Sequence, residues 1–377
     1  MENIDRLLVE SFLAQGDIAG LLRYKENPTP HPRSGHRLCF INGYLWLIGG
    51  YVHFLPLSRG PRVPMMEIVD KEVWRFDPML SNWKKMEVEG EPPKTMASHA
   101  LCSSGTVTDQ LINLHVYDTE LSRWSKLDDH LNEENDFIPE GVYGHSLVIV
   151  KDSLYIIGGT AGQQFFNSVN RFDLGEKKWE RVFDHIVIFN EEDDVPSGRY
   201  RQECVTYMER WIFMIGGGTS AELKANISEP DDLEIREFQP PDVRCHSLAI
   251  DGSTIYMVGG FLSSSREGRA AGTSKCSDAI WKLDINPERL SEEKYNPKIL
   301  TLNWIKIQQN LPQPIFFHDS VYAFEHGEIF VFGGNNKNGK RNNDLTRLRI
   351  QPGSLETLSK KVKYRHFGEE KTKFTCL

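Results

Sequence analysis

Five short apolar runs in this chain of 377 residues each end in a pair of glycines. They occupy residues 45–50, 154–159, 211–217, 255–260 and 329–334. In three places an aromatic residue followed by Asp precedes a Trp, with six residues in between: Phe76 before Trp83, Tyr117 before Trp124 and Phe172 before Trp179. A repeat of about 50 residues that combines short strands, glycine pairs and spaced aromatic residues predicts an array of similar β-sheets.

Three features fix the phase of each repeat: an Arg or Tyr close to a His at its start, the glycine pair, and the aromatic–Asp pair with its Trp. All three occur in residues 33–83 and again in 143–179. The interval between Gly50 and Gly159 spans about two repeats, so a second unit without a glycine pair lies there, beginning near His99. This unit is short by about one strand, either as a three-stranded remnant or as the product of a shortened transcript.

The repeats predict an all-β, six-bladed β-propeller with degenerate second and fourth blades. Its ring must close, since an open edge strand would pair with other chains. We expect a strand at 21–26 to complete the sixth blade. The predicted organisation is a short N-terminal helical or frayed segment at 1–17, the propeller at 18–352 and a basic C-terminal tail at 353–377.

Composition excludes several classes of protein. The net charge of −9 argues against general nucleic-acid binding, which needs a positive field. No apolar stretch is long enough to predict a membrane span, and the first residues do not resemble a signal peptide. The six cysteines are isolated, which argues against a disulfide framework or a zinc site. We therefore expect a cytoplasmic or nuclear protein without a metal or cofactor.

One face of the disk is expected to bind a ligand. Successive antiparallel strands bring the start of the first strand and the end of the second to the same side of a sheet. Guanidinium groups that converge there would suit a carboxylate, because they form paired hydrogen bonds. The predicted peptide-binding residues are Arg33, Tyr143, Arg199, Arg201, Arg244, His246 and His318. Two structural alternatives remain open: the histidines as buried hydrogen-bonding groups, and the arginines as partners of carboxylates in neighbouring blades.

Several stretches carry a resemblance to a known family: Arg33-Ser34-Gly35-His36, Arg199-Tyr200-Arg201, Gly216-Gly217-Gly218-Thr219-Ser220, Arg244-Cys245-His246-Ser247 and Ile280-Trp281-Lys282-Leu283. With them the chain resembles kelch-repeat β-propellers that serve as substrate receptors of Cullin-2 ubiquitin ligases. The resemblance implies binding of client proteins by their C-terminal peptides. It also implies docking on Elongin B/C and Cullin-2 through a helical box, for which Leu355 and Leu358 are the candidate residues. Ser359 and Lys363 depart from the apolar pattern of that box.

The predicted function is that of a protein-interaction module, the substrate-recognition subunit of a Cullin-RING ubiquitin ligase. The alternative is a scaffold or cytoskeletal adaptor that uses the same face without a ligase. A kelch-type copper oxidase is disfavoured, because the histidines are spread one per blade instead of converging on a metal. No phosphate-binding loop and no Gly-x-Ser-x-Gly elbow occurs. We therefore predict no catalytic residues.

Overall fold

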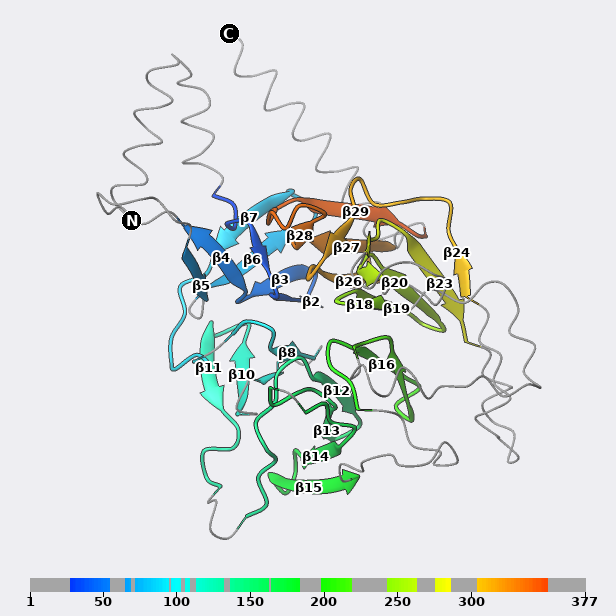
Figure 1. Cartoon of the computed structure of the whole chain (residues 1–377). Helices are drawn as coiled ribbons and strands as arrows, with labels where there is room; N and C mark the ends of the chain where they lie inside the picture. Colours follow the sequence, from blue (N-terminus) through cyan, green and yellow to red (C-terminus); the bar gives the residue numbers. More distant parts are fainter. Residues whose placement is uncertain are drawn as a thin grey trace, which may run out of the picture.

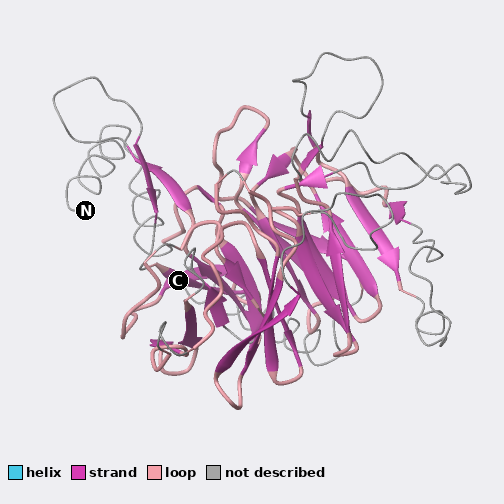
Figure 2. Ribbon diagram, turned by 60° about the horizontal axis from the view of Figure 1, so that its bottom comes forward, coloured by secondary structure: helices cyan, strands magenta, loops and turns pink. Residues whose placement is uncertain are grey.

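A computed structural model describes residues 28–54, 65–68, 72–94, 96–102, 106–108, 113–131, 136–162, 164–183, 198–218, 243–262, 275–285 and 304–351. These residues form strands, turns and loops, with no helix among them (Figures 1 and 2). Accordingly, the described ranges contain no helix that could cross a membrane. The segment predicted as helical or frayed at 1–17, the strand predicted at 21–26 and the predicted tail at 353–377 lie outside these ranges.

Six main sheets follow one another along the described chain, and all their pairings are antiparallel. The first contains β2 (Arg37–Ile41), β3 (Tyr44–Ile48), β6 (Val73–Asp77) and β7 (Asn82–Lys85). The second contains β8 (Ala100–Leu101), β9 (Thr106–Thr108), β10 (Leu114–Asp118) and β11 (Arg123–Lys126). The third contains β12 (Ser146–Val150), β13 (Ser153–Ile157), β14 (Val169–Asp173) and β15 (Lys178–Phe183).

The remaining three main sheets complete the series. The fourth contains β16 (Glu203–Tyr207) and β17 (Trp211–Ile215). The fifth contains β19 (Ser247–Asp251), β20 (Thr254–Val258), β23 (Ile280–Asp284) and β24 (Trp304–Lys306). The sixth contains β26 (Asp319–Ala323), β27 (Glu328–Phe332) and β29 (Leu345–Arg349). We call the first strand of each main sheet its inner strand and name each sheet by it.

The inner strands surround a common centre. Each of the strands β2, β8, β12, β16, β19 and β26 lies against the next, and β26 lies against β2. Outer strands such as β7, β11, β15 and β24 lie at the periphery (Figure 1). The main sheets therefore form a closed, all-β ring, the arrangement expected of a propeller.

Alternating side chains of β3 explain why its sequence is apolar throughout. Leu45 and Leu47 pack with Phe330 and Phe332 of the β26 sheet. Trp46 and Ile48, on the opposite face of β3, pack in the cluster that includes Trp124 of the β8 sheet. Since both faces of the sheet are buried against neighbours, a polar face would leave the core unfilled.

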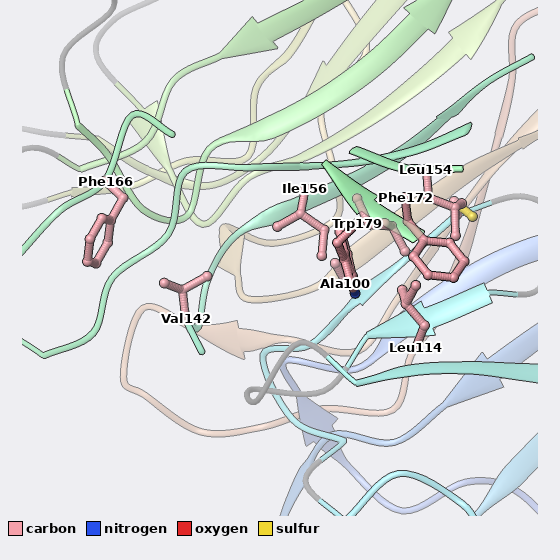
Figure 3. Packing of buried hydrophobic residues seen from close by; sticks show 10 residues of the cluster. Ala100, Leu114, Val142, Leu154, Ile156, Phe166, Phe172 and Trp179 are labelled. Carbon is pink, nitrogen blue, oxygen red and sulfur yellow. The ribbon is translucent and has the colours of Figure 1, made fainter. Parts of the chain in front are cut away.

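The aromatic–Asp–Trp motif has a local structural cause. In the β12 sheet the Phe172 and Trp179 rings lie 5.2 Å apart, edge to face, in the core that also contains Leu114 of the β8 sheet (Figure 3). The Asp that follows Phe172 closes the turn to the next strand: Asp173 Oδ1 accepts hydrogen bonds from the amides of Gly175 and Glu176. The motif thus fixes a tight hairpin and places two large rings in the inter-sheet core.

The β8 sheet corrects one prediction. It has four strands in the order β8–β9–β10–β11, so the second unit is not a three-stranded remnant. The shorter chain length of this unit is explained by its two short strands: β8 has two residues and β9 has three. The sequence of β9, Thr-Val-Thr, is β-branched throughout and therefore suits a strand although it lacks an apolar run.

Among the described residues, short ribbons or bridges join the entries of five inner strands, all but that of β8, to the segment after the glycine pair. They comprise β1 (Arg33–Ser34) with β4 (Tyr51–Phe54) and β5 (Met65–Ile68), β18 (Val243–Arg244) with β21 (Phe261–Leu262) and β22 (Lys275–Cys276), and β25 (Ile315–Phe316) with β28 (Asn335–Asn336). Single bridges from Tyr143 to Thr160 and from Tyr200 to Gly218 do the same in the β12 and β16 sheets. These pairings confirm that the repeat starts and the glycine pairs share a face.

Candidate functional site: the axial ring

One residue from each main sheet contributes to a closed ring of backbone hydrogen bonds around the centre. Each amide donates to the carbonyl of the corresponding residue in the preceding sheet, with N···O distances from 2.8 to 3.4 Å. Gly35 closes the ring by donating to Phe317, so the first and last sheets are joined. The ring residues are Gly35, Ser98, Gly144, Arg201, Cys245 and Phe317, and we call them the axial ring.

All six residues of the axial ring have left-handed backbones, with φ between +56° and +66°. Glycine adopts this conformation without strain, whereas for other residues the conformational free-energy cost is on the order of 1–2 kcal/mol. Four of the six are not glycine. Residues kept in such conformations cluster at functional sites, which directs attention to the side chains that the ring presents.

Arg201 has the most unusual environment of these side chains. One of its terminal nitrogens donates to Ser98 Oγ at 2.5 Å, and its guanidinium lies 4.8 Å from the centre of the Phe317 ring. Its Nε is buried and has no hydrogen-bond acceptor. Among the ion pairs of the described residues none includes Arg201. Burial lowers the pKa of Arg201, yet a guanidinium stays protonated in proteins, so the ring presents a positive charge that has no counter-ion within the described ranges.

The residues directly after the axial ring point into the packing between sheets. His36 Nε2 and His318 Nε2 each lie 3.1 Å from a carbonyl oxygen of the preceding sheet, and Gln202 donates to the equivalent carbonyl at 2.8 Å. His246 is buried against Gly216 of the preceding sheet. The structure thus corrects the prediction for His246 and His318, because both are buried inter-sheet residues and neither lies at the mouth.

Arg33 is also not a mouth residue. Its side chain is 0% exposed and donates to the carbonyls of His31 and Gly49 and to Glu72 Oε2, the last at 2.8 Å. Although burial raises the pKa of Glu72, hydrogen bonds from Lys85 and Arg33 lower it to about 2. Arg33 therefore pairs with a carboxylate of its own repeat, since Glu72 directly precedes β6, and the alternative of a carboxylate in a neighbouring blade does not hold for this residue.

The other predicted residues flank the axial ring. Tyr143 and Arg244 directly precede ring residues, and the Arg244 guanidinium lies 5.3 Å from the centre of the Phe261 ring. Arg199 donates to the carbonyl of Gly216 at 3.2 Å. All three side chains are partly exposed. The structure therefore brings Tyr143, Arg199 and Arg244 to the face where Arg201 lies.

A layer of polar residues below the axial ring was missed at the sequence level. It consists of the first residue of every inner strand except β8, which begins with Ala100, and three of its members are charged: Arg37, Glu203 and Asp319. Arg37 pairs with Glu203 at 2.8 Å and with Asp319 at 3.7 Å. We call these three residues the channel floor. The sequence does contain a pattern that indicates these residues: each of the three charged residues directly follows the His or Gln at the start of its repeat.

The three residues of the channel floor help to line a channel of about 270 Å³, to which all six inner strands contribute residues. Its deeper lining includes Cys39, Cys102, Val205 and Ala249. Burial raises the pKa of the Cys39 thiol, which therefore stays protonated. Among the described residues no group of three or more His, Cys, Asp or Glu side chains is arranged to hold a metal ion.

Comparison with known proteins agrees with the ring of repeats. A domain profile described as the KLHDC2/KLHL20/DRC7 Kelch-repeats domain matches residues 104–260. Kelch domain-containing protein 10 of Homo sapiens is 25% identical over 359 residues, which cover 88% of this chain and 73% of that protein. The chain is a kelch-repeat protein. Within this group it is similar to the Xenopus tropicalis protein of the same name, at 26% identity over 87% of this chain and 77% of that protein. The Drosophila melanogaster homologue is 28% identical over 85% of this chain and 55% of that protein.

Proposed function

We propose that this kelch-repeat protein binds client proteins by their C-terminal peptides at the axial ring. The observation that carries the proposal is the Arg201 guanidinium, which contacts the axial-ring residues Ser98 and Phe317 of two other sheets and has no carboxylate partner among the described residues. A half-buried cation whose Nε has no acceptor is unfavourable, so an incoming carboxylate would gain a charge-assisted hydrogen bond there. The neighbouring Arg199 and Arg244 add positive charge to the same face.

The architecture that supports this binding mode is a propeller in which each main sheet is one blade. Six inner strands in mutual contact and one axial-ring residue per sheet support a blade count of six. Such an arrangement brings side chains from distant parts of the chain to one mouth. Kelch-repeat proteins generally act as interaction scaffolds, which agrees with a binding module and not with an enzyme.

The ligase role rests on the resemblance of the chain to Cullin-2 substrate receptors. It needs Elongin B/C and Cullin-2 as partners in the cytoplasm or nucleus, and the candidate docking residues Leu355 and Leu358 lie outside the described residues. Purification of the full chain from cells tests it. Elongin B/C in the purified complex supports the receptor. Client proteins without Elongin B/C would instead favour the scaffold alternative.

Replacing Arg201 by Gly is expected to weaken peptide binding by about 10-fold to 150-fold, the effect of losing a charge-assisted hydrogen bond of roughly 1.5–3 kcal/mol. Glycine suits this site because the axial ring already has glycine at two positions, Gly35 and Gly144. The measurement is the dissociation constant of a free-acid peptide selected from a random-sequence library.

Two controls accompany that measurement. Arg210, over the Trp211 ring at the far end of the same sheet, is the matched arginine, and its replacement by Ala should leave the affinity unchanged. The C-terminal amide of the same peptide should bind as weakly to the wild-type protein as the free acid binds to Arg201→Gly. Equal affinity of acid and amide for the wild-type protein would refute the carboxylate site.

A further inference from the structure

The channel floor contains more negative than positive charge. Arg37, from β2, is the single cation and lies between the carboxylates of Glu203 and Asp319. In the order of the ring, β16 stands three places from β2 in either direction, so the Arg37–Glu203 pair spans the channel. The Arg37 Nε also donates to the His99 carbonyl at 3.0 Å, which fixes the guanidinium at a third sheet.

The two carboxylates of the floor differ in how firmly they are held. Glu203 accepts a hydrogen bond from Arg37 at 2.8 Å, whereas the closest approach of Arg37 to Asp319 is 3.7 Å. Asp319 is also buried, and its carboxylate accepts the amides of Leu38 and Ser320 at 2.7 and 2.9 Å. Of the two acids of the floor, Asp319 therefore interacts more weakly with Arg37, the one cation of the floor.

The floor and the axial ring are close enough to interact electrostatically. Glu203 is two residues from Arg201 on the same strand entry, and the charges of Arg37 and Glu203 both act on the pKa of Arg201. Arg199 and Arg244 are partly exposed, so solvent screens their charges more strongly than those of the floor. Within the floor and Arg201 themselves, a carboxylate bound to Arg201 would give three carboxylates and two guanidinium groups. Such an excess of negative charge in a poorly hydrated site is relieved when one carboxylate takes up a proton.

We propose that Asp319 takes up a proton from solvent when a carboxylate binds at Arg201, and so acts as a positioning residue that couples ligand affinity to pH. The proposal rests on the proposed function, because it assumes that the ligand brings a carboxylate to the axial ring. The proton neutralises the Asp319 side chain, and Arg37 is then left to compensate Glu203 alone. Asp319 does this without contact to the ligand.

The surroundings of Asp319 agree with this role. Burial raises the pKa of Asp319 to about 7, and the charge of Glu203 acts in the same direction, while Arg37 and the amide hydrogen bonds from Leu38 and Ser320 oppose it. Besides these two charges, β2 brings the Cys39 thiol, which burial keeps protonated by raising its pKa. The adjacent strand β19 begins with the buried Ser247, and the β27 residue opposite Asp319 is the apolar Phe332. The neighbouring His318 is held by the Val258 carbonyl and burial lowers its pKa to about 4, so it is neutral at pH 7.

Proton uptake fixes the direction of the pH dependence. Below the pKa of free Asp319 the residue is already protonated, and affinity is at its maximum. Above it, binding requires a proton from solvent, so affinity falls by up to about tenfold per pH unit. The test measures the dissociation constant of the selected free-acid peptide from about pH 6 to about pH 8.5, above the titration range of a peptide carboxylate.

Asp319→Asn should bind with little dependence on pH, whereas Asp344→Asn, an exposed control, should keep the wild-type profile. Calorimetry on the wild-type protein in two buffers of different ionisation enthalpy needs no variant and should detect proton uptake above about pH 7. Preference for the free acid without proton uptake would overturn the inference and leave the proposed function standing. No preference for the free acid would overturn both.

Discussion

Acidification from about pH 7.5 to about pH 5 is expected to unfold this protein cooperatively. Five buried histidines directly follow residues of the axial ring: His36, His99, His145, His246 and His318. Burial lowers the pKa of His99 and of His246 to about 3, that of His145 and of His318 to about 4, and that of His36 well below its usual range. In the unfolded chain each would titrate near pH 6.5.

The sign of the effect follows from the difference in bound protons. Between the folded and unfolded pKa values the unfolded state binds more protons, so the free energy of unfolding falls as the pH falls. Each histidine contributes up to about 1.4 kcal/mol per pH unit in this range. Five of them together remove about 10 kcal/mol by about pH 5, which is comparable with the typical domain stability of about 5–15 kcal/mol. Asp319 acts in the opposite direction because burial raises its pKa to about 7, but it is one group against five.

The chain itself supplies the control variant for this prediction. Gln202 occupies the position of these histidines in the β16 sheet and makes the same inter-sheet hydrogen bond, to the Ile157 carbonyl, without a titratable group. The His318→Gln variant should therefore retain most of the free energy of unfolding at about pH 7.5. On acidification its free energy of unfolding should fall less steeply than that of the wild type, because unfolding takes up about one proton fewer. Urea unfolding followed at several pH values measures both. An unchanged pH dependence in this variant would show that His318 does not contribute to acid unfolding.

The repeat was readable from the sequence because its residues meet local requirements. Glycine pairs, the turn-forming Asp and the spaced rings each act within one sheet, so their spacing predicted the strands and the shared face. The β8 sheet was misjudged because its strands are too short to leave an apolar run, although Thr106–Thr108 still pairs with both neighbours.

The ligand-binding face was predicted less well than the fold, since it depends on where a side chain points. Arg33 and Arg201 both stand close to a repeat start, yet Arg33 is enclosed by Glu72 and backbone carbonyls while Arg201 contacts other residues of the axial ring. The difference is one of register: Arg201 directly precedes its Gln, in the left-handed position, whereas Arg33 stands three residues before His36. Counting from the His or Gln would have identified the axial ring and the floor.

Replacing Gly49 by Ala is expected to lower the free energy of unfolding by at least about 3 kcal/mol, as for other severe steric conflicts with the backbone. Gly49 has a φ of +65°, and a Cβ there would lie 2.1 Å from the Met96 carbonyl oxygen and 3.1 Å from His99 Cε1. Relief would require the β8 sheet to move away from the β2 sheet. Because the sheets form a closed ring, such a shift must be accommodated by every other interface or by opening the ring.

Gly339→Ala separates this steric effect from backbone strain. Gly339 also has a left-handed backbone, with a φ of +74°, but nothing lies within 4 Å of a Cβ added there. Its replacement should cost only the conformational term of about 1 kcal/mol. Urea unfolding of the two variants at neutral pH gives the comparison. If both lost the same stability, the close approach of neighbouring sheets at the glycine pair would not be what requires glycine, and the repeat would need another physical explanation.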